Sequence, residues 1–201
     1  MSETAVGAVL RALSYAAAKH RDQRRKGAGA PPFINHSIEV AELLARAAGI
    51  EDPVTLQAAV LHDTLEDTDT TFDDLAREFG TEVATLVQEV TDEKHLPRAE
   101  RKRHQIETAP RLSERARLIR LADKIVNVHA ITWTPPVEWP LERRLDYLEW
   151  TAQVVEHCRG SCEPLERLYD QVLADGMKAL SGRGGEFRQP PSSTHSPASD
   201  R

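Results

Sequence analysis

The sequence predicts an all-α protein with a single domain, folded as a bundle of about eight or nine helices. Apolar residues recur at helical spacing along most of the chain, and no stretch alternates long enough to indicate a sheet. A chain of 201 residues supplies one good core rather than two domains and a linker. In chain order, the apolar stripes are Val6, Val9, Leu10 and Leu13; Val40, Leu43, Leu44 and Ala47; Val83, Leu86, Val87 and Val90; Leu118, Leu121, Ala122 and Ile125; Leu141, Leu145, Leu148 and Ala152; and Leu165, Leu168 and Val172.

Residues typical of helix ends separate these stripes. Gly80 followed by Thr81 predicts a helix stop and the next N-cap, and Ser113 predicts another helix start. Thr71 with Asp74 three residues later is a weaker form of a capping box. Prolines lie between the periodic segments, where they cap or separate helices. These are Pro53, Pro97, Pro135, Pro136, Pro140 and Pro164.

The end of the chain differs in composition from the rest. Residues 181–201 contain five Ser, three Gly and three Pro with almost no aliphatic side chains. Such a composition cannot build a core, so it predicts a disordered tail. We therefore expect one folded domain over residues 1–180 and a tail over 181–201.

Composition and charge narrow the class of protein. Hydrophobic residues make up 40% of the chain and charged residues 29%, as in a globular protein. The formal net charge of -6 gives no general attraction for nucleic acid, so no nucleic-acid partner is expected. No apolar run approaches the roughly 18 residues of a membrane span, and the first residues do not resemble a signal peptide. We expect no membrane partner and a cytoplasmic location.

A cluster of ionisable residues interrupts an apolar helix that is expected to begin near Pro53. It consists of His62 and Asp63, with Glu66 one helical turn beyond the histidine and Asp67 one turn beyond the aspartate. Three carboxylates this close raise one another's pKa unless a cation lies among them. The cluster therefore predicts a divalent ion.

A plainer interpretation is that His62 is a hydrogen-bonded core histidine and that the acids form a solvated face. Two other positions weigh against it. His36 lies at the start of the helix that carries Val40, and Asp123 lies beside an apolar stripe, with Asn127 one turn later. Two histidines and two aspartates are the minimum for a mixed imidazole and carboxylate metal site.

Taken together, these motifs resemble the HD-domain hydrolases. Within them the chain resembles the hydrolase domain of RelA/SpoT enzymes, and most closely the stand-alone small alarmone hydrolases of the metazoan SpoT-homologue type. The similarity runs from about residue 5 to residue 180. The segments that carry it are Lys19–Lys26, Phe33–His36, His62–Thr68, Val90–Lys94, Glu100–Arg103 and Leu121–Lys124.

The resemblance implies an HD-type helical bundle and a role for each matching residue. The implied metal ligands are His36, His62, Asp63 and Asp123, and the implied ion is Mn²⁺, although this ligand set also suits Fe, Co, Ni or Zn. The implied catalytic pair is Glu66 and Asp67. The implied substrate-binding residues are Arg25, Lys26, Asn127, Arg143 and Tyr147.

The implied reaction removes pyrophosphate from the ribose 3′ position of guanosine tetra- or pentaphosphate. An ion would lower the pKa of a bound water, and Glu66 and Asp67 would position that water or accept its proton, with Glu66 the favoured base. No synthetase, TGS or ACT region is found, so hydrolysis alone is expected. The sequence departs from the family at Phe33, where relatives often have Tyr, and at Ser37, where they often have Pro.

A basic run supports a polyphosphate substrate on physical grounds. Six cationic or potentially cationic groups lie between Lys19 and Lys26, and arginine makes bidentate, charge-assisted contacts with phosphate. By itself such a run is often only a solvated helix end. Gly27 to Ala30 form a flexible turn between these cations and His36, so both can face one pocket.

Two other functions stay open at this point. One is a different HD phosphohydrolase, acting on a nucleotide 5′-phosphate or on the 2′-phosphate of NADPH. The other is a module that binds the nucleotide without cleaving it, which predicts a defective acidic pair or a missing ligand. The sequence leaves the oligomeric state open.

Overall fold

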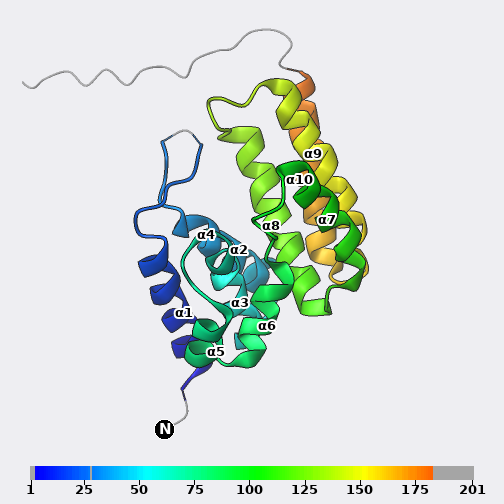
Figure 1. Ribbon diagram of the computed structural model, residues 1–201. Coiled ribbons are helices and arrows are strands. Elements are labelled where there is room, and N and C mark those ends of the chain that lie inside the picture. The colour runs from blue at the N-terminus through cyan, green and yellow to red at the C-terminus, as the bar shows by residue number, and fades with distance from the viewer. Residues whose placement is uncertain (1–2, 28, 183–201) are drawn as a thin grey trace, which may run out of the picture.

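The computed structural model describes residues 3–27 and 29–182, and there the secondary structure is helical without a strand (Figure 1). Because α4 is a single four-residue turn, the remaining α-helices number nine within these ranges, as the sequence predicts. The elements are α1 Ala5–Lys19, α2 Ile34–Ala47, α3 Pro53–Leu61, α4 Thr64–Asp67, α5 Phe72–Phe79, α6 Thr81–Val90, α7 Arg98–Thr108, a 3₁₀ helix Ala109–Arg111, α8 Glu114–Trp133, α9 Leu141–Glu156 and α10 Glu163–Ser181.

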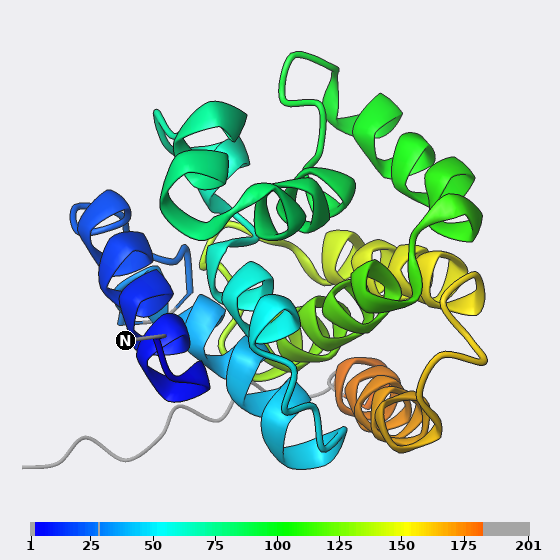
Figure 2. The same ribbon diagram turned by 90° about the horizontal axis from the view of Figure 1, so that it is seen from below.

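Helix α8 is the centre of the bundle. It packs against α10, α2, α9 and α6, so its residues are buried on several faces (Figure 2). Helix α3 is the other interior element, between α1, α2 and α6, and its last four residues are buried. Of the four predicted metal ligands, Asp123 lies in α8, and His62 and Asp63 follow directly after the end of α3. None of the described helices is long and apolar enough to cross a membrane.

The predicted helix ends are confirmed with one correction. Thr71 and Asp74 form a full capping box, and the Ser113 hydroxyl accepts a hydrogen bond from the Ala116 N–H. At Gly80 the prediction was wrong about the cap. Gly80 itself ends α5 and caps α6, because its φ of 90° suits glycine, and Thr81 is the first residue of the helix.

The prediction of one continuous helix from Pro53 through the acidic cluster was also wrong. Helix α3 ends at Leu61, and α4 begins at Thr64. The cause is local competition for carbonyl groups. The Thr64 hydroxyl donates to the Leu61 carbonyl at 2.6 Å, and His62 Nδ1 lies 2.8 Å from the Ala59 carbonyl oxygen. The break places His62 and Asp63 at a corner between two helical segments.

The loop between α1 and α2 is held as a hairpin against the end of α8. Phe33 N–H donates to the Gln23 carbonyl at 3.1 Å, and an isolated antiparallel bridge joins Arg24 to Pro32. A Cβ on Gly27 would collide with the carbonyl oxygen of Thr134, so only glycine allows this approach. The loop is therefore fixed in a position that brings its basic residues to α8.

The predicted tail begins where α10 ends. Helix α10 runs to Ser181, one residue past the expected end of the domain. Residues 183–201 lie outside the described residues, so the prediction of a disordered tail stays a prediction.

Candidate metal centre

Four side chains meet at the corner between α3, α4, α2 and α8. His36 from α2 is buried, and its Nε2 lies 3.1 Å from Asp123 Oδ1 of α8 and 3.6 Å from Asp63 Oδ2. His62 Nε2 lies 3.1 Å from the same Asp63 oxygen and 3.9 Å from Asp123 Oδ1. The structure thus brings together the predicted ligands from three separate parts of the chain.

The centre suits a divalent ion. One ligand atom each from His36, His62 and Asp123 lie within 4.8 Å of one another, and Asp63 adds an oxygen that contacts both imidazoles. His62 Nδ1 is positioned to donate to the Ala59 carbonyl, which leaves Nε2 as the free lone pair. Among the described residues, this buried Nε2 makes no hydrogen bond, as expected of a metal ligand.

Without a bound cation, a proton on the His62 imidazole balances the negative charge of the aspartates. Burial opposes a charged imidazole, but Asp63 and Asp123 outweigh it and raise the pKa of His62 to about 9. Burial likewise opposes ionisation of Asp63, yet His62 and His36 lower its pKa to about 2. Burial lowers the pKa of His36. A divalent cation would replace the proton on His62 and balance the same two carboxylates.

A second layer of side chains orients Asp123. Its Oδ1 accepts a hydrogen bond from Asn127 Nδ2 at 2.5 Å, and its Oδ2 lies 3.1 Å from the buried ammonium of Lys124. Asn127 in turn accepts a hydrogen bond from Arg25 Nη2 at 2.9 Å. One chain of contacts therefore runs from the basic loop to a candidate metal ligand. The Lys124 ammonium also lies 4.6 Å from the centre of the Trp150 ring.

The centre opens into a cavity of about 270 Å³. The cavity has both acidic and basic groups in its wall, which suits a hydrolytic reaction on a phosphorylated substrate. Its lining residues are Arg25, Phe33, His36, His62, Asp63, Glu66, Val90, Asp92, Gln105, Arg120, Asp123, Lys124, Asn127, Tyr147 and Trp150.

The two predicted catalytic acids occupy different environments. Glu66 lies in the cavity wall, where burial and then the nearby carboxylates of Asp92 and Asp63 raise its pKa to about 7. Asp67 is not part of this wall, and its carboxylate pairs with Lys94 at 3.1 Å. A carboxyl group whose pKa lies near neutral pH, beside a candidate metal centre, is suited to general base catalysis in its ionised form.

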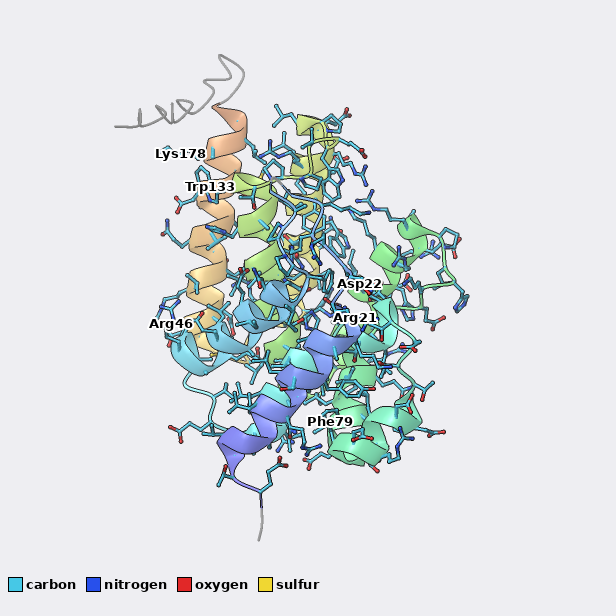
Figure 3. The ribbon with its side chains drawn as sticks, turned by 90° about the vertical axis from the view of Figure 1, so that its left-hand side faces the viewer. Arg21, Asp22, Arg46, Phe79, Trp133 and Lys178 are labelled. Carbon is cyan, nitrogen blue, oxygen red and sulfur yellow. The ribbon has the colours of Figure 1, made fainter. Side chains whose placement is uncertain are left out.

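The predicted basic run divides into cations that face the cavities and cations that do not. Lys19 pairs with Asp69 at 2.7 Å, and Arg21 pairs with Asp22 at 3.1 Å on the surface just after α1 (Figure 3). Arg25 alone of the run lines the metal cavity. The prediction that all six groups can neutralise substrate was therefore too broad.

Two further cavities adjoin the first. One of about 300 Å³ shares Arg25 and Phe33 with the metal cavity and also contains Lys26. The next, of about 440 Å³, shares Lys26 and contains Arg143. The predicted substrate residues are therefore spread over three neighbouring hollows that share lining residues. The largest of the three is not the one that holds the candidate ligands. The candidate site is therefore assigned from the side chains that line a cavity and not from the volume of the cavity.

Tyrosine and tryptophan side chains line two of these hollows. Tyr147 and Trp150 line the metal cavity, and Trp139 lines the cavity that contains Arg143. Tyr147 lies in the metal cavity, with its ring 5.7 Å from that of Trp139 and 5.2 Å from that of Trp150. Burial raises the pKa of the Tyr147 hydroxyl, so it stays protonated. Arg143 lies 4.2 Å above the Trp139 ring. Arg98 also lies 5.2 Å from the centre of this ring, so Trp139 is in contact with two guanidinium groups.

Sequence reasoning gave no individual role to four polar residues of the cavity, which are Asp92, Gln105, Arg120 and Lys124. Arg120 is buried, and its Nη2 donates to the Val90 carbonyl at 2.9 Å. Asp92 accepts a hydrogen bond from Gln105 Nε2 at 2.5 Å. The sequence does carry a signal, because Arg120 and Lys124 lie one turn apart in an otherwise apolar stretch of the helix. Buried cations need a partner, so their presence there indicates a polar site.

Comparison with known proteins agrees with this geometry. A family model described as an HD domain matches residues 12–146. The chain belongs to the HD-domain family. Guanosine-3′,5′-bis(diphosphate) 3′-pyrophosphohydrolase MESH1 of Mus musculus is 48% identical to this HD-domain chain over 167 residues, which cover 83% of the chain and 93% of the mouse protein.

Two more relatives of this HD-domain chain are similar to it over most of their length. The MESH1 protein of Homo sapiens is 51% identical over 158 residues, covering 79% of the chain and 88% of the human protein. The solved structure of a metazoan ortholog of SpoT that hydrolyses ppGpp has a TM-score of 0.82 and 45% identity. It covers 84% of this chain and 94% of its own. These likenesses confirm the all-α HD fold and the small-hydrolase subfamily that the motifs indicated.

Proposed function

We propose that this protein is a Mn²⁺-dependent hydrolase that removes the 3′-pyrophosphate of guanosine tetra- or pentaphosphate, giving GDP or GTP and pyrophosphate. The observation that carries the proposal is the cluster of His36, His62, Asp63 and Asp123 beside Glu66 in one cavity. The names of the MESH1 relatives support the choice of substrate. We assign the activity to residues 1–180 and a cytoplasmic location to the protein.

The four clustered side chains would hold the ion. Two imidazole nitrogens and two carboxylate oxygens suit Mn²⁺ and other divalent transition metals alike. When bound, such an ion favours ionisation of water and screens the negative charge of a phosphoryl group. The orphaned Nε2 of His62 and the anionic pair of aspartates supply the physical reason for binding.

Glu66 takes the proton in this scheme. Its carboxylate accepts a proton from water as the water oxygen bonds to the phosphorus next to the ribose 3′-oxygen. The bond between that phosphorus and the 3′-oxygen breaks, pyrophosphate leaves, and the 3′-oxygen gains a proton to become a hydroxyl. Asp67 does not take the proton in this scheme, because its carboxylate pairs with Lys94 and is not part of the cavity wall.

The substrate is held by groups that surround the centre. Arg25 and Lys124 in the metal cavity offer cationic donors to the phosphates, and Asn127 lies between them. Tyr147 lines the metal cavity, and Lys26 and Arg143 line the neighbouring hollows that would receive the rest of the nucleotide. Lys124 is buried and already pairs with Asp123, so a bound phosphate would be a second anionic partner for its ammonium group.

The test is direct incubation of the purified protein with Mn²⁺ and guanosine tetraphosphate. The expected products are GDP and pyrophosphate, and Asp63→Ala is expected to lose both metal content and turnover. NADPH and nucleoside 5′-monophosphates serve as competing substrates in parallel reactions. Faster turnover of either would replace the alarmone as substrate, and tight binding without turnover of any would indicate a non-catalytic module.

A further inference from the structure

Two cations, one from the segment between α6 and α7 and one from the start of α7, contact the two acids of α4. Lys94 Nζ donates to the Glu66 carbonyl at 2.8 Å and lies 3.1 Å from Asp67 Oδ1. Arg101, on the first turns of α7, donates through Nη1 to Glu66 Oε1 at 2.9 Å. Each acid of the pair therefore has its own cation, supplied by a part of the chain far from it in sequence.

The two ion pairs differ in their surroundings. The Lys94 side chain is 59% exposed, and an ion pair in that setting contributes little. The Arg101 side chain is 29% exposed and that of Glu66 is 19% exposed, so water screens this pair less. Arg101 is not part of the metal-cavity lining, so it reaches the reaction centre only through Glu66.

Glu66 depends on that cation because other anions surround it. Asp63 and Asp67 face it from its own turn, and Asp92 faces it from the segment after α6. Arg101 is the opposing charge, supplied by α7. A carboxylate among three others without this arginine would turn away from them or take up a proton.

We propose that Arg101 is a positioning residue, which holds the Glu66 carboxylate in the cavity wall, aimed and ready to accept the proton of water. This deepens the proposed function and rests on it. The contact is one hydrogen bond from Nη1 to Oε1 at 2.9 Å. Arginine suits the role better than lysine because the planar guanidinium gives this donor a fixed direction, whereas an ammonium group acts as a point charge. The neighbouring Lys94 contacts the backbone carbonyl of Glu66 and the carboxylate of Asp67, so it does not aim the base.

The experiment compares Arg101→Ala, Arg101→Lys and Arg103→Ala in Mn²⁺-dependent hydrolysis of guanosine tetraphosphate. Arg103 is the matched control, since it lies on the same helix, is 69% exposed and pairs with Glu107. Arg101→Ala is expected to lower kcat by about 10- to 100-fold with little change in KM, because a misaimed base slows the chemical step. Arg101→Lys is expected to recover part of kcat, and Arg103→Ala to behave as the unaltered protein.

Two readouts separate positioning from a structural or substrate-binding role. In Arg101→Ala the acid limb of the pH profile is expected to move to higher pH, while bound Mn²⁺ per chain, measured by elemental analysis, stays the same. Infrared spectroscopy of the metal-free protein is expected to show the Glu66 carboxyl band, identified by its loss in Glu66→Gln, persisting to higher pH.

Several results would overturn the proposal. One is a raised KM with unchanged kcat in Arg101→Ala. Another is an acid limb and a carboxyl band that do not move in this variant. The third is a parallel loss of metal and folding in Arg101→Ala that Arg101→Lys does not restore. Activity of the unaltered protein distinguishes the two levels of inference. If that protein does not hydrolyse guanosine tetraphosphate, the proposed function fails. If it does, and Arg101→Ala is unaffected, only the positioning role fails.

Discussion

Asn127 Nδ2 donates a hydrogen bond to Asp123 Oδ1 at 2.5 Å, one turn along the same helix. Because Asn127 also accepts from Arg25 at 2.9 Å, its side-chain amide is fixed at both ends. This arrangement joins Arg25, a proposed substrate-binding cation, to a candidate metal ligand through one residue. It makes the orientation of the Asp123 carboxylate depend on a group that does not itself bind the ion.

Replacing Asn127 by Ala is expected to weaken Mn²⁺ binding by about 10- to 100-fold, as loss of groups that orient metal ligands generally does. KM should also rise, because Arg25 loses its anchor. Isothermal titration with Mn²⁺ and steady-state kinetics measure the two effects. His129→Ala, an exposed change on the same helix, is the control. Unchanged Mn²⁺ affinity in Asn127→Ala would show that the contact with Asp123 is dispensable.

Metal binding is expected to release about one proton at neutral pH, since a bound ion requires the neutral imidazole. Asp63 and Asp123 overcome burial and raise the pKa of metal-free His62 to about 9, so the proton is present below that pH and must leave. Apparent Mn²⁺ affinity should therefore increase with pH up to about 9 and level off beyond it. Titration calorimetry in buffers of different ionisation enthalpy measures the release. Equal heats in all buffers at neutral pH would contradict this account.

Hydrolysis is expected to rise with pH through about 7. Burial raises the pKa of Glu66 to about that value, and only the ionised form accepts a proton, so kcat falls below it. Glu66→Gln should lower kcat by about 10²- to 10⁴-fold, the usual size of a general base contribution, and abolish the limb. The pH dependence of kcat at saturating substrate and metal is the measurement. An unaltered limb in Glu66→Gln would assign it to another group.

The approach of the basic loop to α8 predicts an effect of Gly27→Ala on substrate binding. The added Cβ would meet the Thr134 carbonyl and push the loop away, displacing Arg25 and Lys26. KM should rise while Mn²⁺ affinity is preserved, because the ligands lie elsewhere. Gly29→Ala is the comparison: its Cβ meets nothing within 4 Å, and only its φ of 80° is strained. Equal KM values for the Gly27 variant and the unaltered chain would contradict a fixed loop.

Much of the fold could be predicted because it depends on local signals, whereas the full set of candidate ligands came from the resemblance to the HD-domain hydrolases. Apolar stripes at helical spacing indicate buried helix faces, and His62 with Asp63 is costly inside such a helix unless it has a function. The break after Leu61 could not be predicted, because it depends on how the Thr64 hydroxyl and the His62 ring compete for carbonyl groups. Sequence spacing also does not tell that Glu66 lines the cavity while Asp67 does not.

Contacts between distant segments were the other gap. Nothing in the sequence pairs Arg101 with Glu66, because the two residues belong to helices whose packing is decided by the whole core. The same holds for Gly27 and Thr134, which meet only when the loop folds back on α8. The sequence shows which residues are charged, whereas the tertiary structure decides which of them pair with one another.

The central claim is that one divalent ion is bound by His36, His62, Asp63 and Asp123 together. Anomalous diffraction from crystals grown with Mn²⁺ tests it most directly. The account predicts a single strong manganese peak within bonding distance of two imidazole nitrogens and two carboxylate oxygens, and its loss in Asp63→Ala. A manganese peak elsewhere with none at this corner, or a peak that Asp123 does not touch, would contradict the claim.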